Sequence, residues 1–355
     1  MKHRNPSRKS SAFTLVEVTL SMVILSIILL VSVQVLNQTQ RTWKQGVARV
    51  EQFREARMAF ESITQDVRQA ILNTYHAYQY NTGDTPTVPD SKTQAPTRYI
   101  RHSELQFVTG QATKLLAGDQ AASLVTHAMF FQARLGLSER DGYEGLNRLL
   151  CGRGFFIMHG GDDAFRPAHV PEMRSRFRLW EYRPPAEQNS IYFSKPGKWF
   201  QNAASSIITS AETIDKPSYT RPIAENIIAL IISPQVTTDD AAKKSVKPWW
   251  IAPQYAYDST ELTNESSDNP QGTQHMLPPR VVVTLVAIDE TSARSLAERT
   301  PDGVPKLVPD GAFAKRDDYR KDLDALETQL RTERLNYRVF SSAITLRNSK
   351  WGLLR

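Results

Sequence analysis

An uninterrupted apolar run near the N-terminus constrains this 355-residue chain more than any other feature. Residues 13–36 read FTLVEVTLSMVILSIILLVSVQVL, and the 19 residues from Val18 to Leu36 carry no charge. A helix rises about 1.5 Å per residue, so this run spans about 28 Å, close to the hydrocarbon core of a bilayer. The run therefore predicts one transmembrane helix segment over residues 13–36.

The leader before this run, residues 1–12, is basic and contains no acidic residue. Its four charges, on Lys2, Arg4, Arg8 and Lys9, are more than half of the formal net charge of +7. Basic residues beside a membrane helix stay on the cytoplasmic side. We therefore expect a single-pass inner-membrane protein with a cytoplasmic N-terminus and a periplasmic globular part. A nucleic-acid partner is not expected, because such proteins carry their basic excess on the folded domain.

Three kinds of N-terminal segment are consistent with an apolar run of this length. A secretory signal peptide needs a cleavage site of small residues after the run, but residues 37–40 read NQTQ. A plain signal anchor fits the run but leaves Glu17 unexplained, because a carboxylate in a lipid-facing helix is costly and usually functional. The third kind is a prepilin, which is cleaved before the run.

The residues around Glu17 resemble the processing motif of type IV pilins and pseudopilins, a small residue followed by Phe-Thr-Leu-x-Glu. Residues 12–17 read AFTLVE. The resemblance implies cleavage between Ala12 and Phe13 by a prepilin peptidase and N-methylation of Phe13. It also implies that Glu17 pairs with the amino group of a neighbouring subunit during assembly. Ala12 stands where the family usually has glycine, which puts the rate of cleavage in question.

An amphipathic pattern follows the apolar run. Apolar or small residues recur every three or four positions from Trp43 to Ala70, and no proline interrupts them. This periodicity predicts that the helix continues over residues 37–72 and packs its apolar stripe on the protein's own sheet. A free coiled coil is the alternative.

The remaining chain predicts a loop over residues 73–98 and a β-rich globular domain over residues 99–355. The loop contains three prolines and an Asn-Thr-Gly-Asp turn, which break helices and strands alike. The strand-like runs are Tyr99–Thr109, Ser123–Gln132, Gly154–His159, Phe177–Tyr182, Ile223–Ser233, Val281–Asp289 and Tyr337–Leu346. Helices are expected near Thr291–Arg299 and Asp317–Arg334. The expected fold is α+β and pilin-like, with a long N-terminal helix packed on a mainly antiparallel sheet that carries long loops.

Two further resemblances concern the order of segments along the chain. The succession Ile227–Ser233, Trp249-Trp250, Leu277-Pro278-Pro279 and Arg280–Ile288 is similar to the minor pseudopilin J of type II secretion systems. Residues 37–43 and 50–57 resemble the Verru_Chthon cassette protein C family, whose members occur together with other prepilin-like proteins. The second resemblance implies other prepilin-like subunits as partners, and it does not indicate a biochemical activity.

Catalytic motifs such as GxSxG, HExxH and the P-loop are absent from the sequence, so no enzyme activity, small-molecule substrate or cofactor is expected. One loop, His159–Asp163, is a weak candidate for calcium, since Asp162 and Asp163 offer the carboxylate oxygens that calcium prefers. A solvated turn is the alternative. The lone Cys151 is interpreted as a small core residue.

Two other features suggest binding. Trp249 and Trp250 offer a platform for a sugar or a partner, although adjacent tryptophans usually place one ring in the core and one at its edge. Basic residues alternate with aromatic ones over residues 174–183, which suits nucleic acid, but an amphipathic strand with a solvated charged face explains the pattern as well.

These observations predict a structural minor pilin or pseudopilin subunit of a type IV pilus or type II secretion pseudopilus. The alternative is a membrane-anchored extracytoplasmic receptor for sugar or DNA that uses the prepilin route only for delivery.

Overall fold

The computed structural model describes two compact units, Met1–Gln52 and Phe53–Arg355. The described residues are 15–51, 53–80, 95–116, 121–143, 145–163, 166, 169–170, 173–189, 199–204, 219–267, 269–300 and 303–351, with side chains left out at 37, 41–51 and 121.

The first unit contributes one long helix, α1 (Leu15–Glu51). Its stretch from Leu15 to Gln40 is long and apolar enough to cross a membrane. The large apolar side chains between Leu15 and Leu36 are 43% to 81% exposed, so the protein's own fold does not cover them.

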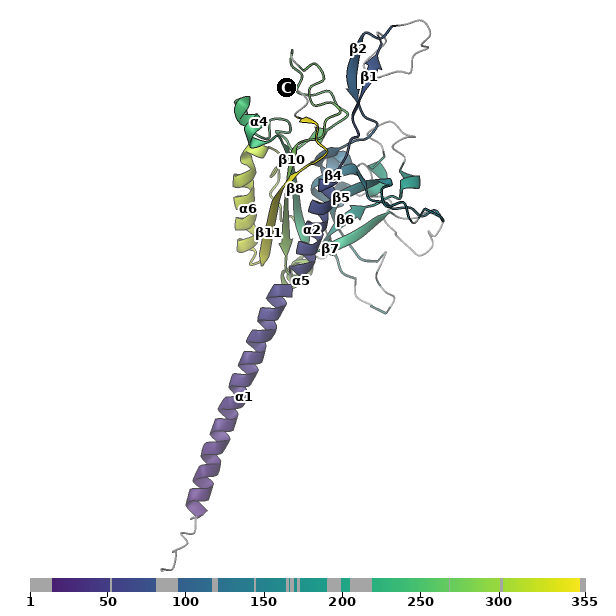
Figure 1. Ribbon diagram of the computed structural model, residues 1–355. Coiled ribbons are helices and arrows are strands. Elements are labelled where there is room, and N and C mark those ends of the chain that lie inside the picture. The colour runs from purple at the N-terminus through teal and green to yellow at the C-terminus, as the bar shows by residue number, and fades with distance from the viewer. Residues whose placement is uncertain are drawn as a thin grey trace, which may run out of the picture. The chain divides into compact units, whose positions relative to one another are not determined.

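Two antiparallel sheets form the body of the second unit (Figure 1). The larger sheet has the order β7-β6-β5-β4-β3-β9, and the smaller has the order β11-β10-β8. The strands of the larger sheet are β3 (Val108–Gln111), β4 (Leu124–Arg134), β5 (Leu150–Gly160), β6 (Arg176–Tyr182), β7 (Thr220–Glu225) and β9 (Tyr257–Asp258). Those of the smaller sheet are β8 (Ile227–Gln235), β10 (Arg280–Ile288) and β11 (Tyr337–Thr345).

The chain passes from the larger sheet to the smaller one at Asn226. Its φ of 61° lies in the left-handed region, which asparagine tolerates better than most residues. The predicted single strand Ile223–Ser233 is therefore wrong, because this turn divides it into β7 and β8. The run Tyr99–Thr109 is likewise divided, between β2 (Arg98–His102) and β3.

A bulge in β4 joins the two sheets. The register with β5 shifts between Val125 and Met129, and Thr126 has a φ of 56°. The bulge turns the side chains of Thr126 and His127 toward β8, at the edge of β8 that does not pair with β10. Thr126 Oγ1 accepts the N–H of Leu230 at 3.0 Å, and His127 Nδ1 accepts that of Ile232 at 3.1 Å. Side chains thus satisfy backbone donors that would otherwise need another strand.

Helix α2 (Arg54–Arg68) buries its apolar stripe against the sheets. Phe60 lies 5.9 Å from Phe340 of β11, measured between ring centroids. On the other side, Asp66 Oδ2 pairs with Arg153 Nε of β5 at 3.0 Å, and Arg153 Nη1 pairs with Glu181 Oε1 at 3.0 Å. The predicted packing of the stripe on the protein's own sheet is therefore confirmed for α2, and a free coiled coil is excluded there.

The expectation of one continuous helix over residues 13–72 is wrong in two places. Phe53 leaves the helical conformation, with φ −108° and ψ 11°, and its side chain packs against the core. Tertiary packing thus takes precedence over helix continuation at this residue. The second helix ends at Arg68, and Ala70 already forms a β-bridge with Ala133 of β4.

Helix α6 (Tyr319–Thr332) covers the opposite face of the smaller sheet. Tyr337 of β11 donates its hydroxyl hydrogen to Glu327 Oε2 of α6 at 2.8 Å, whereas Phe340 faces α2. Shorter helices complete the unit: α3 (Ala112–Leu115), α4 (Thr238–Lys243) and α5 (Glu290–Arg299). The helices α5 and α6 confirm the two predicted near these positions.

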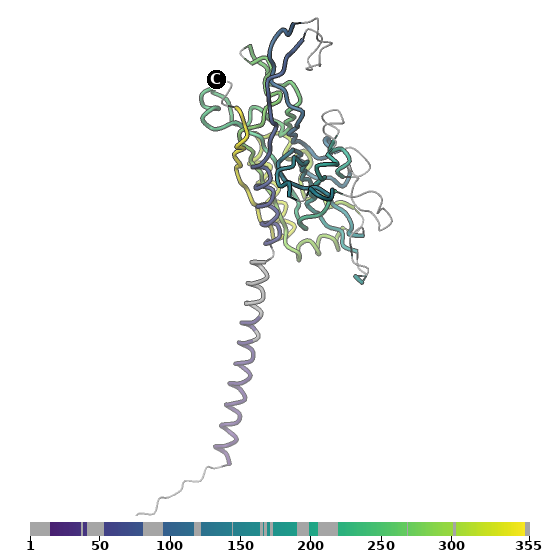
Figure 2. Tube along the Cα trace, turned by 45° about the vertical axis from the view of Figure 1, so that its right-hand side comes forward, coloured from purple at the N-terminus to yellow at the C-terminus, as the bar shows by residue number. Residues whose placement is uncertain are grey.

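A two-stranded hairpin of β1 (Tyr75–Gln79) and β2 projects from the second unit. Figures 1 and 2 both show it at the end of this unit opposite to the start of α2. The prediction of a loop over 73–98 is therefore wrong for β1 and for the start of β2. The five residues YHAYQ of β1 form the strand because they pair with β2 in register, and tertiary pairing outweighs the nearby turn signals.

The core between the elements is rich in aromatic residues. Phe130 stacks on Phe200 at 4.5 Å between centroids, and the ring of Trp199 meets both. Gly154 leaves room for this cluster, since a Cβ there would lie 2.2 Å from the Phe130 ring. Cys151 is fully buried and unbridged, which confirms it as a core residue. The fold is α+β with a long apolar N-terminal helix and a mainly antiparallel β domain, as predicted.

Candidate functional site

The N-terminal turn of α1 contains Glu17, the one acidic residue of that turn. A negative charge near a helix N-terminus is favourable, because the backbone N–H groups there are unpaired and the helix dipole is positive. Glu17 is exposed, as are its apolar neighbours. The carboxylate is therefore accessible to another molecule at the start of an otherwise apolar surface.

The polar side chains further along α1 are adapted to apolar surroundings. The hydroxyls of Thr19, Ser21, Ser26, Ser32 and Thr39 each donate to a backbone carbonyl three or four residues earlier, at 2.7 to 3.0 Å. A hydroxyl satisfied within its own helix costs less in hydrocarbon than an unbonded one. Glu17 is thus the charged exception in this stretch. Ala12 and Phe13 lie outside the described residues, so cleavage and methylation there stay predictions.

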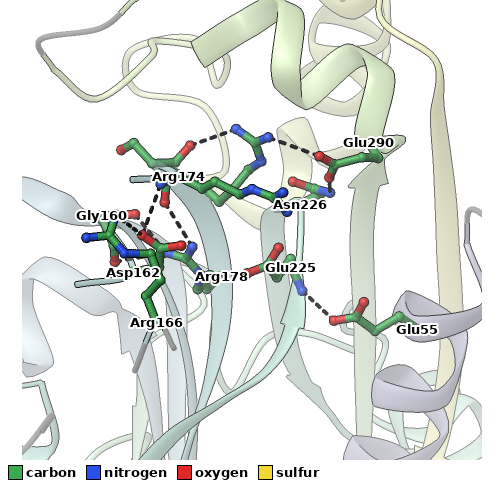
Figure 3. A network of polar contacts seen from close by, with 12 residues as sticks. Glu55, Gly160, Asp162, Arg166, Arg174, Arg178, Glu225, Asn226 and Glu290 are labelled. Carbon is green, nitrogen blue, oxygen red and sulfur yellow. Dashed lines mark hydrogen bonds and ion pairs between the residues drawn. The ribbon is translucent and has the colours of Figure 1, made fainter. Parts of the chain in front are cut away.

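The loop with the calcium candidates belongs to a network of polar contacts (Figure 3). Asp162 Oδ1 accepts the N–H of Arg174 at 3.0 Å and lies 3.8 Å from the guanidinium of Arg166. Asp163 Oδ1 lies 3.3 Å from another nitrogen of Arg166. The two carboxylates therefore share an arginine. Calcium binding here stays a prediction, and a calcium ion would have to compete with that arginine.

Arg178 of β6 supplies a second positive charge to the same loop. Its guanidinium donates to the carbonyls of Gly160 and Gly161, at 2.7 and 3.0 Å, and its Nε pairs with Glu225 Oε1 at 3.0 Å. Backbone carbonyls of this kind are what calcium would otherwise use. The side chain is 1% exposed, so the network stabilises the loop from within.

The same network extends to the helices. Arg176 pairs with Glu290 of α5 at 3.0 Å, and Asn226 donates to the other oxygen of Glu290 at 2.9 Å. Glu55 of α2 accepts the N–H of Glu225 at 2.8 Å, and burial is the largest of the causes that raise its pKa. The interpretation of residues 174–183 as a strand with a solvated charged face is therefore wrong for Arg176 and Arg178. Both are buried and paired, so neither is accessible to nucleic acid.

The paired tryptophans agree better with one ring at the core and one at its edge than with an exposed platform, since Trp249 and Trp250 are each half-buried. Trp249 donates its Nε1 hydrogen to Asp317 at 2.8 Å, and the guanidinium of Arg316 lies 4.8 Å from its ring centroid. Trp250 packs against the core. The rings are occupied by the protein's own side chains, which leaves them little surface for a ligand.

A cavity of about 410 Å³ lies at the base of the β1–β2 hairpin, and the sequence indicated nothing of it. It is lined by three segments that are far apart in the chain, residues 74–76 with 99–101, residues 271–277 and residues 348–350. Arg101 and Lys350 contribute its arginine and lysine side chains. Neither residue belongs to a sequence motif. The site can be recognised only in the folded chain, where these segments lie side by side.

Comparison with known proteins concerns the N-terminus alone. The family model of the prokaryotic N-terminal methylation motif matches residues 7–33, a stretch that includes Ala12, Phe13 and Glu17. No curated protein and no solved structure matches the chain. The matched motif implies processing by a prepilin peptidase and assembly with other pilin subunits. Together with the long apolar stretch of α1, this match indicates a prepilin-like N-terminus that anchors the chain in a membrane by a single pass.

Proposed function

We propose that the protein is a structural minor pilin or pseudopilin, assembled through α1 into a type IV pilus-like or type II secretion pseudopilus fibre. The observation that carries the proposal is the carboxylate of Glu17 in the first turn of α1, a helix whose large apolar side chains are exposed. Such a helix needs lipid or other apolar helices around it, because exposed apolar area of this extent is unfavourable in water.

The position of Glu17 suits pairing with a cation in apolar surroundings. A carboxylate there is costly unless it is paired, and the matched motif includes the new amino terminus that cleavage before Phe13 would create. Pairing between Glu17 of one subunit and Phe13 of the next would offset that cost and set the helical register of the fibre. The periplasmic location of the globular domain and its low copy number are part of the proposal.

The test substitutes Glu17→Gln, which removes the charge and keeps the size of the side chain. A matched control is Gln34→Ala, which removes a neutral polar group from the same helix. In the native host we expect both variants in the membrane fraction at wild-type levels. The Glu17→Gln protein should fall by about tenfold or more in the sheared fibre fraction, the effect of about 1.4 kcal/mol lost. Assembly of Glu17→Gln at the level of the control would refute the proposal.

Processing is tested separately by mass spectrometry of the mature chain. The expected N-terminus is a methylated Phe13. A chain that keeps residues 1–12, or one cleaved after the apolar run, would contradict the proposed maturation.

A second candidate, an anchored binding protein, is favoured by the cavity at the base of the hairpin. The two candidates are compatible, because a fibre subunit can carry a binding site on its globular domain.

A further inference from the structure

The cavity at the base of the β1–β2 hairpin takes three of its lining residues from one face of that hairpin. The strand register pairs His76 with Arg101 and Tyr78 with Tyr99, and cross-strand partners share a face. His76, Arg101 and Tyr99 line the cavity. Its volume of about 410 Å³ is within the range of sites for small molecules.

Among the residues that the structure describes, no acidic side chain forms an ion pair with Arg101. Its Nη2 donates to two neutral acceptors, Asn269 Oδ1 at 3.3 Å and the carbonyl of Gly272 at 2.9 Å. Its Nε is buried and has no hydrogen-bond partner among the residues that the structure describes. Burial is the main cause that lowers the pKa of this guanidinium. A guanidinium remains charged in proteins, so the cavity wall holds a partly desolvated cation with unused hydrogen-bonding capacity.

Lys350 adds a second positive charge to the lining of the cavity. Its ammonium donates to the carbonyl of Thr74 at 2.6 Å, which leaves two of its three hydrogens for other acceptors. In the part of the chain that the structure describes, neither Arg101 nor Lys350 forms an ion pair. The nearby acid Glu104 is not among the lining residues, and it accepts the hydroxyl hydrogen of Tyr75 at 2.6 Å.

The rest of the lining is neutral. His275 lies 4.8 Å from His102 between ring centroids, and burial lowers the pKa of His275 to about 4, so it is uncharged at neutral pH. Tyr99 is 67% exposed at the rim and Tyr75 is 43% exposed. Met276 and Leu277 contribute apolar surface. The cavity therefore combines two localised cations with flat aromatic rings and a small apolar area.

We propose that this cavity binds a carboxylated sugar, such as a hexuronate unit of an acidic polysaccharide. A carboxylate suits the guanidinium of Arg101, because a hydrogen bond between two charged groups is stronger than one between neutral groups. Lys350 would bind the second side of the same anionic group. The rim tyrosines offer ring faces that suit the apolar surface of a sugar ring.

The arrangement favours a sugar over nucleic acid. Nucleic-acid grooves track many phosphates with a stripe of basic residues, whereas here the cations that face the cavity are Arg101 and Lys350, with histidines beside them. A single anionic group attached to a ring matches this distribution of charge better. The hairpin projects at the end of the second unit away from the start of α2 (Figures 1 and 2), where a polymer can reach it.

The experiment uses the full chain in detergent micelles and measures binding by calorimetry. The probes are trimers of galacturonate, glucuronate and mannuronate, and the methyl ester of each trimer serves as its uncharged counterpart. At least one acid should bind, and its ester should bind about tenfold or more weakly. Arg101→Gln should weaken the acid by about tenfold or more, the usual scale for a charge-assisted bond. Arg98→Gln, on the same strand but outside the cavity lining, should bind like wild type.

Lys350→Gln gives an independent test should Arg101→Gln fail to fold, because Lys350 is exposed and near the end of the chain. It too should weaken binding severalfold. The proposal is overturned if none of the acids binds, if the esters bind equally well, or if neither cavity variant changes the affinity. Tighter binding of a single-stranded oligonucleotide or of a carboxylate-ended peptide would overturn the assignment to sugar.

Discussion

His127 is a buried histidine whose hydrogen bonds determine its tautomer. Nδ1 accepts the N–H of Ile232, so Nε2 must carry the hydrogen that it shares with the carbonyl of Phe313 at 3.0 Å. The ring is 1% exposed, and burial lowers its pKa from 6.5 to about 4. Protonation would place a hydrogen on Nδ1 against the Ile232 N–H. We therefore expect His127 to stabilise the fold only in its neutral form.

The magnitude follows from linkage between protonation and folding. The unfolded chain binds this proton near pH 6.5 and the folded chain only near pH 4, so the unfolded state holds more protons between these values. Stability from this group is fully present above pH 6.5 and is lost as the pH falls toward 4. Between about pH 7.5 and about pH 4.5 the loss amounts to about 2.6 kcal/mol.

The assay is urea unfolding of the full chain in micelles, followed by tryptophan fluorescence, for wild type and His127→Asn. The asparagine oxygen can still accept the Ile232 N–H, but the Phe313 carbonyl loses its donor, which costs about 1–3 kcal/mol near pH 7.5. The advantage of wild type over the variant should shrink by about 2.6 kcal/mol on going to about pH 4.5.

Tyr255→Phe provides the control. Its ring lies 4.6 Å from His127 between centroids, and its hydroxyl is buried without a hydrogen-bond partner. The substitution disturbs the same packing and leaves the titrating group in place, so the pH dependence of wild type should be retained. A difference between wild type and His127→Asn that is constant over the pH range would refute the reasoning.

Two further substitutions, each with a matched control, test which contacts hold α2 on the sheets, and urea unfolding is the measurement. Arg153→Met leaves two buried carboxylates without their shared partner and should cost about 3–5 kcal/mol, while Arg221→Met, at a side chain 59% exposed, should cost less than about 1 kcal/mol. Equal effects would contradict the role of burial. Phe60→Ala removes a ring that is 9% exposed and should cost about 3–5 kcal/mol, whereas Met58→Ala, 59% exposed on the same helix, should stay within about 0.5 kcal/mol. A loss at Met58 as large as at Phe60 would refute the assigned face.

The regular parts of the fold were predictable because local pattern and tertiary environment agree there. The buried strands β4, β5, β6 and β10 are marked by β-branched and aromatic residues, and α5 and α6 by amphipathic spacing. The predicted bounds of helices and strands were wrong where the backbone changes direction at a single residue. Phe53 is non-helical directly before α2 although no helix-breaking residue is near it, and Asn226 divides an apolar run that looks continuous. Both depend on contacts with distant segments.

The charged residues of β6 show the same limit. Alternation of Arg176 and Arg178 with aromatic residues suggested one solvated face, because strands usually bury one face only. In the fold, acids from β7 and α5 reach these arginines from other segments. The alternating pattern indicates that the two faces of the strand differ. It does not indicate which distant residues will form ion pairs with the charged side chains.

The sequence alone was enough to predict the apolar N-terminal helix and to single out Glu17. A charge-free run of membrane length and a carboxylate at its start are local properties of consecutive residues. The sequence also determined the α+β class, through the periods of its apolar residues. The tertiary structure alone decided the cavity of Arg101 and Lys350, the arginine network around Asp162 and the neutral state of His127. Each of these depends on side chains that are distant in the chain and adjacent in space. Their burial changes the free energy of ionising a side chain, and a local sequence pattern does not show that burial.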